Sequence, residues 1–211
     1  MRGEWRAINT PAERVPSHGT DYFGQRYAYD FARLSPDGRR YTPRGLLWQL
    51  AAAQPVSAFF SWGQPVFTAF AGYVIAVGDE WPDRARINAI WELLRALLNP
   101  PRPAGRDYRP LAGNFVLAEG EPGVALYAHL RCGSVRVRTG QAIASGELLG
   151  EVGNSGNSTM PHLHFHLMDG PDPFTAAGRL CAFRGYERLD KESWLPVAEG
   201  VPGLLERVRA C

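Results

Sequence analysis

Lysine is almost absent from this chain of 211 residues. Lys191 is the one lysine, and arginine supplies the other 22 of the 23 basic residues. The net charge is also small, because 21 acidic residues leave a formal balance of +2. A balance this small gives no reason to expect nucleic acid or an anionic membrane surface as a partner. We interpret the arginine excess as coding bias, and it leaves one candidate for any chemistry that needs a lysine.

Cysteine pairs, long apolar runs and an export signal are also missing. The three cysteines, Cys132, Cys181 and Cys211, show no CxxC spacing. An odd number without close pairs makes neither a disulfide framework nor a cysteine-based structural zinc site. No stretch approaches the roughly 18 apolar residues of a membrane helix, and residues 1–20 lack the apolar core of a secretory signal. We therefore expect a soluble protein without a membrane span, either cytoplasmic or a processed secreted form.

The composition that remains is that of an ordinary globular domain. Hydrophobic residues make up 45% of the chain and charged residues 21%, which is typical of a protein that buries a core. We expect a single domain over residues 1–211. Short apolar segments separated by turns predict strands at 27–32, 64–78, 115–119, 124–130, 134–137, 148–152 and 162–168. Strands this short and closely spaced predict a mainly β fold, a sandwich or a barrel.

Helices are expected in few places. Apolar residues recur every three and four positions over residues 84–98, which predicts a helix that a proline-rich stretch then ends. A short helix near 46–53 and a terminal helix within the last forty residues are also predicted. The segment 64–78 is predicted as two strands around a tight turn at Gly72.

Histidine is concentrated in one segment. Three of the five histidines fall within five residues, at His162, His164 and His166. Side chains on a strand alternate between its faces, so these three imidazoles would share one face. Imidazole is the commonest protein metal ligand and a good general base near neutral pH. A run of half-buried polar side chains is the other interpretation, but the alternation behind a glycine-asparagine turn favours a metal or catalytic site.

The segment GNSGNSTMPHLHFHL, residues 153–167, resembles the signature of the lysostaphin-type zinc endopeptidases, whose fold is the duplicated hybrid motif. Three earlier segments agree with the family and occur in its order, residues 63–74, 126–130 and 133–146, and residues 149–156 then lead into the signature. Outside the resemblance, residues 81–112 are predicted as a helical insertion and residues 169–211 as a C-terminal extension. The resemblance implies a β-sandwich or barrel-sandwich hybrid that binds Zn²⁺ and hydrolyses peptides, with peptidoglycan as the expected substrate.

The resemblance also implies a role for each site residue. His164 corresponds to a zinc ligand, and Asp30, in Tyr-Ala-Tyr-Asp-Phe, fits the family's aspartate ligand. His129 and His162 correspond to histidines that face the metal-bound water and the substrate carbonyl. Zinc with three protein ligands keeps a position for water and lowers the pKa of that water. Nearby imidazoles can then take the proton and stabilise the developing oxyanion.

One expected ligand is missing from its usual place. Family members carry His-x-x-x-Asp, but Arg26 stands four residues before Asp30, and arginine stays protonated and cannot bind zinc. We predict that His18 replaces this ligand, because two glycines between it and Asp30 allow the chain to fold back. His166 is the competing candidate, and a site that binds zinc weakly or not at all is the third interpretation. Asp21 could orient the imidazole of His18, although a solvated carboxylate is at least as good an interpretation.

Two other function classes compete with an enzyme. A degenerate family member would act as a binding or regulatory module; Arg26 motivates this hypothesis, although the other expected positions are filled. A swinging-arm carrier is the other, because the hairpin within residues 133–150 also resembles lipoyl and biotinyl modules. Such carriers need a lysine at the hairpin tip, and Lys191 lies far outside that hairpin, which excludes this class.

Overall fold

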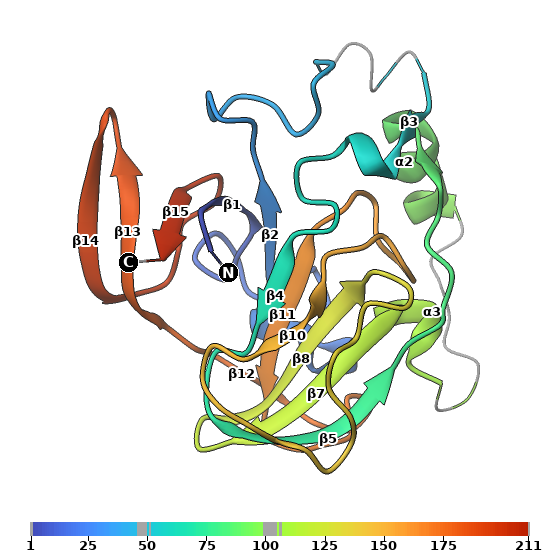
Figure 1. Cartoon of the computed structure of the whole chain (residues 1–211), viewed down its shortest axis with the longest axis vertical. Coiled ribbons are helices and arrows are strands. Elements are labelled where there is room, and N and C mark those ends of the chain that lie inside the picture. The colour runs from blue at the N-terminus through green and yellow to red at the C-terminus, as the bar shows by residue number, and fades with distance from the viewer. Residues whose placement is uncertain (1, 46–49, 51, 99–104, 106, 211) are drawn as a thin grey trace.

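The structure is a computed structural model that describes residues 2–45, 50, 52–98, 105 and 107–210 (Figure 1). Strands predominate, and the prediction of a mainly β fold is confirmed. The strands are β1 Glu4–Asn9, β2 Tyr29–Arg33, β3 Gln54–Pro55, β4 Pro65–Phe67, β5 Gly72–Gly78, β6 Arg86–Ile87, β7 Asn114–Gly120, β8 Gly123–Leu130, β9 Ala142–Ile143, β10 Leu148–Glu151, β11 Leu163–Met168, β12 Gly178–Arg179, β13 Phe183–Asp190, β14 Ser193–Gly200 and β15 Arg207–Ala210. The helices are α2 Ala89–Leu98 and α3 Arg109–Ala112, with 3-10 turns η1 Tyr22–Tyr27 and η2 Val56–Ala58.

One large antiparallel sheet holds most of these strands. Its order is β14-β13-β15-β1-β2-β11-β8-β7-β5-β9, and β12 pairs with the free part of β11. The histidine strand β11 therefore lies in the middle of the sheet, between β2 and β8 (Figure 1). The remaining described strands form two short pairs, β10 with β4 and β3 with β6.

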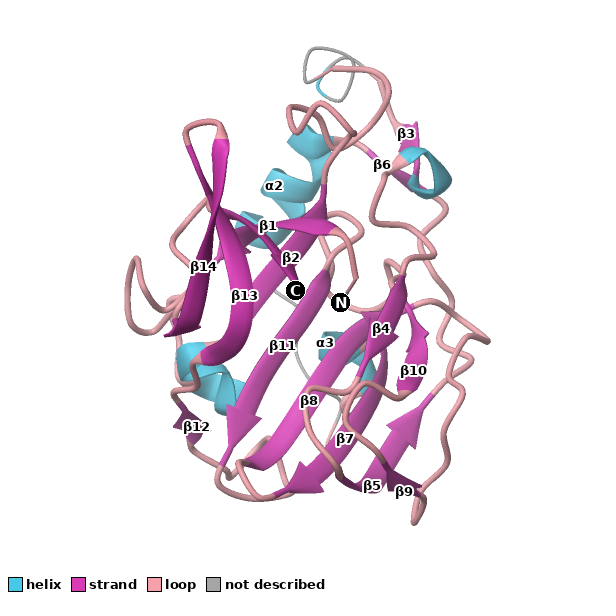
Figure 2. Cartoon of the chain, turned by 60° about the vertical axis from the view of Figure 1, so that its left-hand side comes forward, coloured by secondary structure: helices cyan, strands magenta, loops and turns pink. Residues whose placement is uncertain are grey.

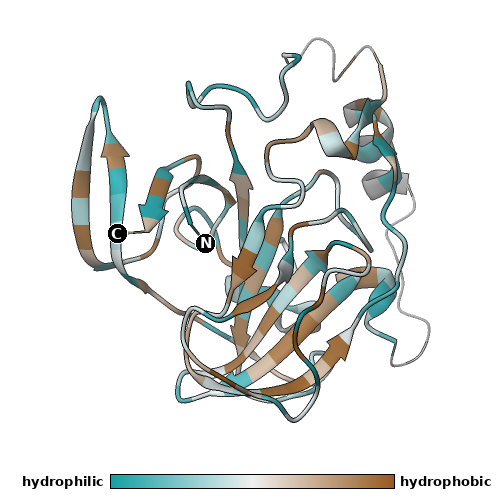
Figure 3. Cartoon of the chain, viewed as in Figure 1, coloured by the Kyte–Doolittle hydropathy of each residue, from teal (hydrophilic) through white to brown (hydrophobic). Residues whose placement is uncertain are grey.

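The central strands are buried on both faces, and alternate side chains belong to different cores. On β11, Leu163, Phe165 and Leu167 belong to the larger apolar cluster, which also contains side chains of β4 and β10. Met168, two residues beyond His166, belongs to a second cluster with Phe23. Apolar residues accordingly follow one another along β7 and β8 (Figure 3), whereas on β11 they alternate with the buried side chains of His164 and His166. Burial on both faces leaves each polar side chain of β11 dependent on a protein partner.

The predicted strands at 115–119, 124–130, 148–152 and 162–168 correspond to β7, β8, β10 and β11. The prediction for 134–137 is wrong, because the backbone amide of Val135 donates to the carboxylate of Asp79 and forms no strand ladder. The segment 64–78 does contain two strands, but they are not a hairpin around Gly72: β4 pairs with β10, and β5 begins at Gly72 and pairs with β7 and β9.

The segment predicted as a helical insertion contains α2. The helix begins at Ala89, five residues later than predicted, because Arg86 and Ile87 pair as β6 with β3 and Asn88 then accepts amide hydrogen bonds from the first helical turn. The helix predicted near 46–53 falls mostly outside the described residues. None of the helices in the described part of the chain is long and apolar enough to cross a lipid bilayer.

The predicted terminal helix is wrong. The last forty residues form a hairpin of β13 and β14 followed by β15, which adds the hairpin to the edge of β1 (Figure 2). The chain reverses at Lys191, whose φ of 54° places it in the left-handed region that a tight turn requires. Tyr186 and Val208 are the inward-facing residues of this unit and belong to the larger core. Pairing with β1 through β15 therefore governs this segment.

Gly113 packs closely against Ser155, in the turn that precedes β11. Its φ of 64° lies in the left-handed half of conformational space, and an added Cβ would lie 2.2 Å from Ser155 Oγ and 2.5 Å from the carbonyl carbon of Ser155. Gly133 has a similar φ of 73°, but nothing lies within 4 Å of its Cβ position. An alanine at Gly113 would therefore meet both an unfavourable φ and a steric clash, whereas an alanine at Gly133 would meet only the unfavourable φ.

We predict that Gly113→Ala lowers the free energy of unfolding by about 3 kcal/mol or more, because it adds a backbone clash to the strain. Gly133→Ala, the matched control, should cost about 1–2 kcal/mol from the strain alone. Chemical denaturation of both variants measures the difference. Equal costs for the two variants would show that the Ser155 turn is free to move away.

Candidate metal and catalytic site

The centre of the site is a pair on neighbouring strands. Asp30 of β2 lies directly opposite His164 of β11 in the strand register, and its Oδ1 lies 2.8 Å from His164 Nδ1. Both side chains are mostly buried, with 8% of Asp30 and 6% of His164 exposed. Directly opposed residues on antiparallel strands have adjacent side chains on the same face. The register alone therefore brings together two residues that are 134 positions apart.

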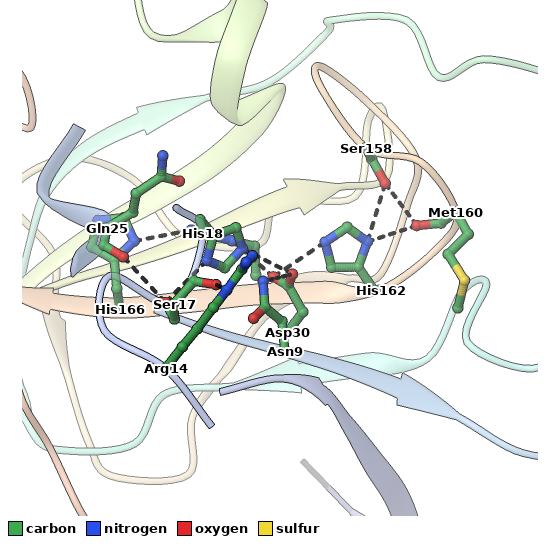
Figure 4. A network of polar contacts seen from close by, with 11 residues as sticks. Asn9, Arg14, Ser17, His18, Gln25, Asp30, Ser158, Met160, His162 and His166 are labelled. Atoms are coloured by element: carbon green, nitrogen blue, oxygen red, sulfur yellow. Dashed lines mark hydrogen bonds and ion pairs between the residues drawn. The ribbon is translucent and has the colours of Figure 1, made fainter. Parts of the chain in front are cut away.

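His18 reaches the same carboxylate from a loop. Its Nε2 lies 2.9 Å from the other oxygen of Asp30, Oδ2, and its ring lies 4.9 Å from the ring of His164. The loop closes because the amide of Ser17 donates to the carbonyl of Arg26 at 2.9 Å. Ser17 Oγ also contacts His18 Nδ1 at 3.1 Å. The chain thus folds back as the two glycines allow, and it places His18 beside Asp30 (Figure 4).

His162 approaches Asp30 from the other side, with Nε2 at 3.3 Å from Oδ1 (Figure 4). Its Nδ1–H donates to the carbonyl of Met160 at 2.7 Å and lies 3.2 Å from Ser158 Oγ. Because Nδ1 is held by the turn before β11, Nε2 is the atom that faces the site. The turn segment thus fixes the orientation of this ring.

His129 reaches the site through a local break in β8. Its φ is +61°, unusual for a residue other than glycine, and the ladder between β7 and β8 shifts register at this end. The break turns the imidazole toward His162 and His164, whose ring centroids lie 4.9 and 5.7 Å away. Nδ1–H of His129 donates to the carbonyl of Ser155 at 3.0 Å, which leaves Nε2 to face the site. Such breaks in a strand commonly re-aim a side chain next to a functional site.

The pKa values of these groups are shifted in different directions. Burial alone would raise the pKa of Asp30, but the imidazoles of His18 and His162 and the hydrogen bonds it accepts hold that pKa well below its usual range. Burial lowers the pKa of His162 as well, and the adjacent carboxylate of Asp30 outweighs this and raises it. Burial and the neighbouring imidazoles lower the pKa of His129 well below its ordinary value, so this ring is neutral. The pKa of His162 is thus raised and the pKa of His129, whose ring lies 4.9 Å away, is lowered. Two neighbouring groups with pKa values shifted in opposite directions are suited to acid–base chemistry.

Two groups of side chains in the described part of the chain have the composition of a metal site. One is His18, Asp30 and His164, and the other is His129, His162 and His164; within each, the ligand atoms all lie within 4.8 Å of one another. Both line a cleft of about 230 Å³. A larger cavity of about 600 Å³ lies on the opposite face of β11, against its apolar side chains, and contains none of these groups. The structure thus brings together all five residues singled out from the sequence, and it places Asp30 and His164 at their centre.

Arg26 and Asp21 lie outside this cluster. Arg26 forms an ion pair with Asp21 at 2.7 Å, and their side chains are 41% and 62% exposed. The hypothesis that Asp21 orients His18 is therefore wrong, because Asp21 is paired with Arg26 and the contact to His18 Nδ1 comes from Ser17. His166 does not join either candidate metal group.

Several groups that hold the histidines were not singled out from the sequence. They are the hydroxyl of Ser17 and the carbonyls of Ser155 and Met160. A carbonyl carries no sequence signal, since every residue has one. The hydroxyl of Ser158, 3.2 Å from His162 Nδ1, is a further such group.

Comparisons with known proteins bear on the same segments. Residues 104–175 match the family described as Peptidase family M23. This segment, about a third of the chain, is similar to peptidase family M23. The matched segment contains His129, His162 and His164, whereas His18 and Asp30 lie before it. The resemblance seen in the sequence is confirmed, and the contribution of the two earlier residues rests on their geometry.

Among curated proteins, the peptidoglycan DD-endopeptidase ShyA of Vibrio cholerae is 38% identical over 60 residues, which are 28% of this chain and 14% of that protein. The match thus spans a small part of the relative.

Among solved structures, the catalytic domain of a mutant of the prophage-encoded M23 protein EnpA from Enterococcus faecalis is 18% identical, with 72% of this chain and 73% of that chain covered and a TM-score of 0.41. The catalytic domain of lysostaphin from Staphylococcus simulans is 23% identical, with 57% and 70% covered and a TM-score of 0.37. A zinc-containing peptidase from Vibrio cholerae is 19% identical, with 72% and 48% covered and a TM-score of 0.36.

The position of Asp30 yields a prediction about His162. Asp30→Asn removes the charge that raises the pKa of His162 and leaves the burial that lowers it. The pKa of His162 should therefore fall below the ordinary histidine value of about 6.5. Imidazole NMR resonances followed against pH in chelator-treated protein measure this change. Asp21→Asn, which removes an exposed carboxylate, should leave the titration of His162 where it is; a His162 titration unchanged by Asp30→Asn would contradict the assignment.

Proposed function

We propose that this protein is a zinc-dependent peptidase that hydrolyses peptide bonds in peptidoglycan. The observation that carries the proposal is the buried carboxylate of Asp30 with His18 and His164 on its two oxygens and the Nε2 atoms of two further histidines facing the same cleft. The relationship to peptidase family M23 supports the reaction class. The substrate class is supported by the name of one relative, which is a peptidoglycan DD-endopeptidase over whose length this chain matches 14%.

His18, Asp30 and His164 are the residues that would hold the ion. They fit zinc chemically, because two imidazoles and a carboxylate are common zinc ligands and three protein ligands leave a position for water or substrate. Bound there, zinc would polarise the scissile carbonyl and lower the pKa of an attacking water. The nitrogens that face Asp30 are Nε2 of His18 and Nδ1 of His164. The other ring nitrogen of His18, Nδ1, contacts Ser17 Oγ at 3.1 Å.

His129 and His162 would handle protons and developing charge. Each commits Nδ1–H to a backbone carbonyl, Ser155 and Met160 respectively, so each presents Nε2 to the cleft. The lowered pKa of His129 leaves its Nε2 with a lone pair that can accept a proton from water. The raised pKa of His162 favours a proton on Nε2, which can be donated to a carbonyl oxygen that gains negative charge. The two rings thus act as base and as donor in the same cleft.

The first test joins metal content to hydrolysis. Purified protein should take up about one zinc ion per chain, and its release of fragments from purified peptidoglycan should stop when a chelator is added. His162→Ala should still bind zinc but hydrolyse about 10²- to 10⁴-fold more slowly, because it removes a proton donor and no ligand. A wild-type protein that takes up no zinc would favour the alternative, a non-catalytic binding or regulatory module. Loss of zinc together with activity in His162→Ala would overturn the assigned roles.

The second test addresses the replaced ligand. His18→Ala should weaken zinc binding by at least about tenfold, because it removes one of three donors from a preformed site. Arg26→Ala, at the position where the family carries its histidine, is the matched control and should bind zinc as the wild type does, because Arg26 pairs with Asp21 outside the cluster. Competition with a chromophoric chelator measures both affinities. Equal affinity in His18→Ala and wild type would remove His18 from the ligand set.

A further inference from the structure

His166 is a buried histidine that the proposed reaction does not use. It follows His164 by two residues on the same face of β11, and none of its surface is exposed. It does not line the 230 Å³ cleft and belongs to neither candidate metal group of the described residues. Its ring contacts Phe23, at a centroid distance of 6.5 Å, in the second apolar cluster. A role as a direct ligand, one of the alternatives from the sequence, therefore lacks support in this arrangement.

The hydrogen bonding of His166 is unusual for a buried imidazole. Its Nδ1 lies 3.0 Å from His164 Nε2, and within the described part of the chain its own Nε2 has no hydrogen-bond partner. Burying a polar ring with one nitrogen unsatisfied disfavours folding. Packing alone gives no reason for a histidine here, because the surrounding Phe23, Leu126 and Met168 are apolar or weakly polar.

The two nitrogens of His164 connect these observations. Nδ1 faces Asp30 at 2.8 Å, and Nε2 faces His166 Nδ1 at 3.0 Å. A neutral imidazole carries one proton, and a metal needs the nitrogen that has the lone pair. Metal binding at Nδ1 therefore requires the proton on Nε2, and a buried N–H needs an acceptor. His166 Nδ1, 3.0 Å away, is placed to be that acceptor.

We propose that His166 is a positioning residue, whose Nδ1 accepts a hydrogen bond from His164 Nε2 and thereby holds His164 in the tautomer and orientation that present Nδ1 to a divalent metal ion. The proposal rests on the proposed function, since it assumes that His164 is a ligand. Hydrogen bonds to the far nitrogen of a ligating histidine fix its tautomer and raise its basicity. Ser17 has the equivalent position behind His18, with Oγ at 3.1 Å from Nδ1. His166 thus contributes to the site without touching metal or substrate.

Two substitutions of nearly equal shape separate hydrogen bonding from packing. In His166→Asn the side-chain oxygen takes the place of Nδ1 and can accept the same hydrogen bond. In His166→Leu a methyl group takes that place and no acceptor remains. Both remove the far part of the ring, so both change the packing against Phe23 alike. Zinc affinity, from competition with a chromophoric chelator, and the melting temperature of the chelator-treated protein are measured for both variants and the wild type.

We expect His166→Leu to bind zinc about 10- to 100-fold more weakly than the wild type, and His166→Asn to keep most of the affinity. The metal-free melting temperature of His166→Leu should not fall below that of His166→Asn, because it buries no unsatisfied polar atom. Equal zinc affinity in His166→Leu and wild type would overturn the positioning role and leave the proposed function intact. Equal losses in both variants would also overturn it, since packing would then explain the effect. A wild-type protein without zinc affinity would overturn the proposed function, and this inference with it.

Discussion

The arrangement of the site depends on one buried negative charge. The Asp30 carboxylate is 8% exposed and carries three imidazoles within 3.3 Å of its oxygens. A carboxylate in such surroundings is stable only when positive charge or hydrogen-bond donors compensate it. Protons on the surrounding histidines can supply this compensation, and so can a divalent cation. The buried charge of Asp30 is therefore stabilised by the histidines around it. Because they share this carboxylate, the protonation of one histidine affects that of the others.

The histidines of the site are positioned by different structural routes. His164 is brought in by the register of β11 against β2, and His18 by a loop that closes through the backbone of Ser17 and Arg26. His129 is brought in by a backbone break at the end of β8, which costs conformational free energy that the surrounding sheet must offset. Regular sheet geometry thus sets the centre of the site, and departures from it bring in the other groups.

The same distinction explains how far the sequence allows prediction. The strands around the site and the shared face of His164 and His166 follow from period-two patterns and turn residues, which are local properties. The position of His18 depends on a loop closed by backbone hydrogen bonds, and the orientation of His129 on a positive φ that its residue type disfavours. The terminal segment was expected as a helix, but its strands are stabilised by pairing with β1, far away in the sequence. Long-range pairing and backbone strain leave little trace in local patterns.

The geometry of the site changes the interpretation of Arg26, which the sequence offered as a sign of a degenerate site. A site that had lost its function would be under no constraint to keep a buried carboxylate, since apolar replacements of buried charges are often neutral or stabilising. Here the carboxylate is present, and a histidine from eight residues earlier in the chain than Arg26 lies 2.9 Å from it. Arg26 itself lies at the surface, paired with Asp21, and puts no cation into the cluster. The substitution of one expected ligand is thus matched by a donor of the same chemistry at the same carboxylate, which favours a displaced ligand over a decayed site.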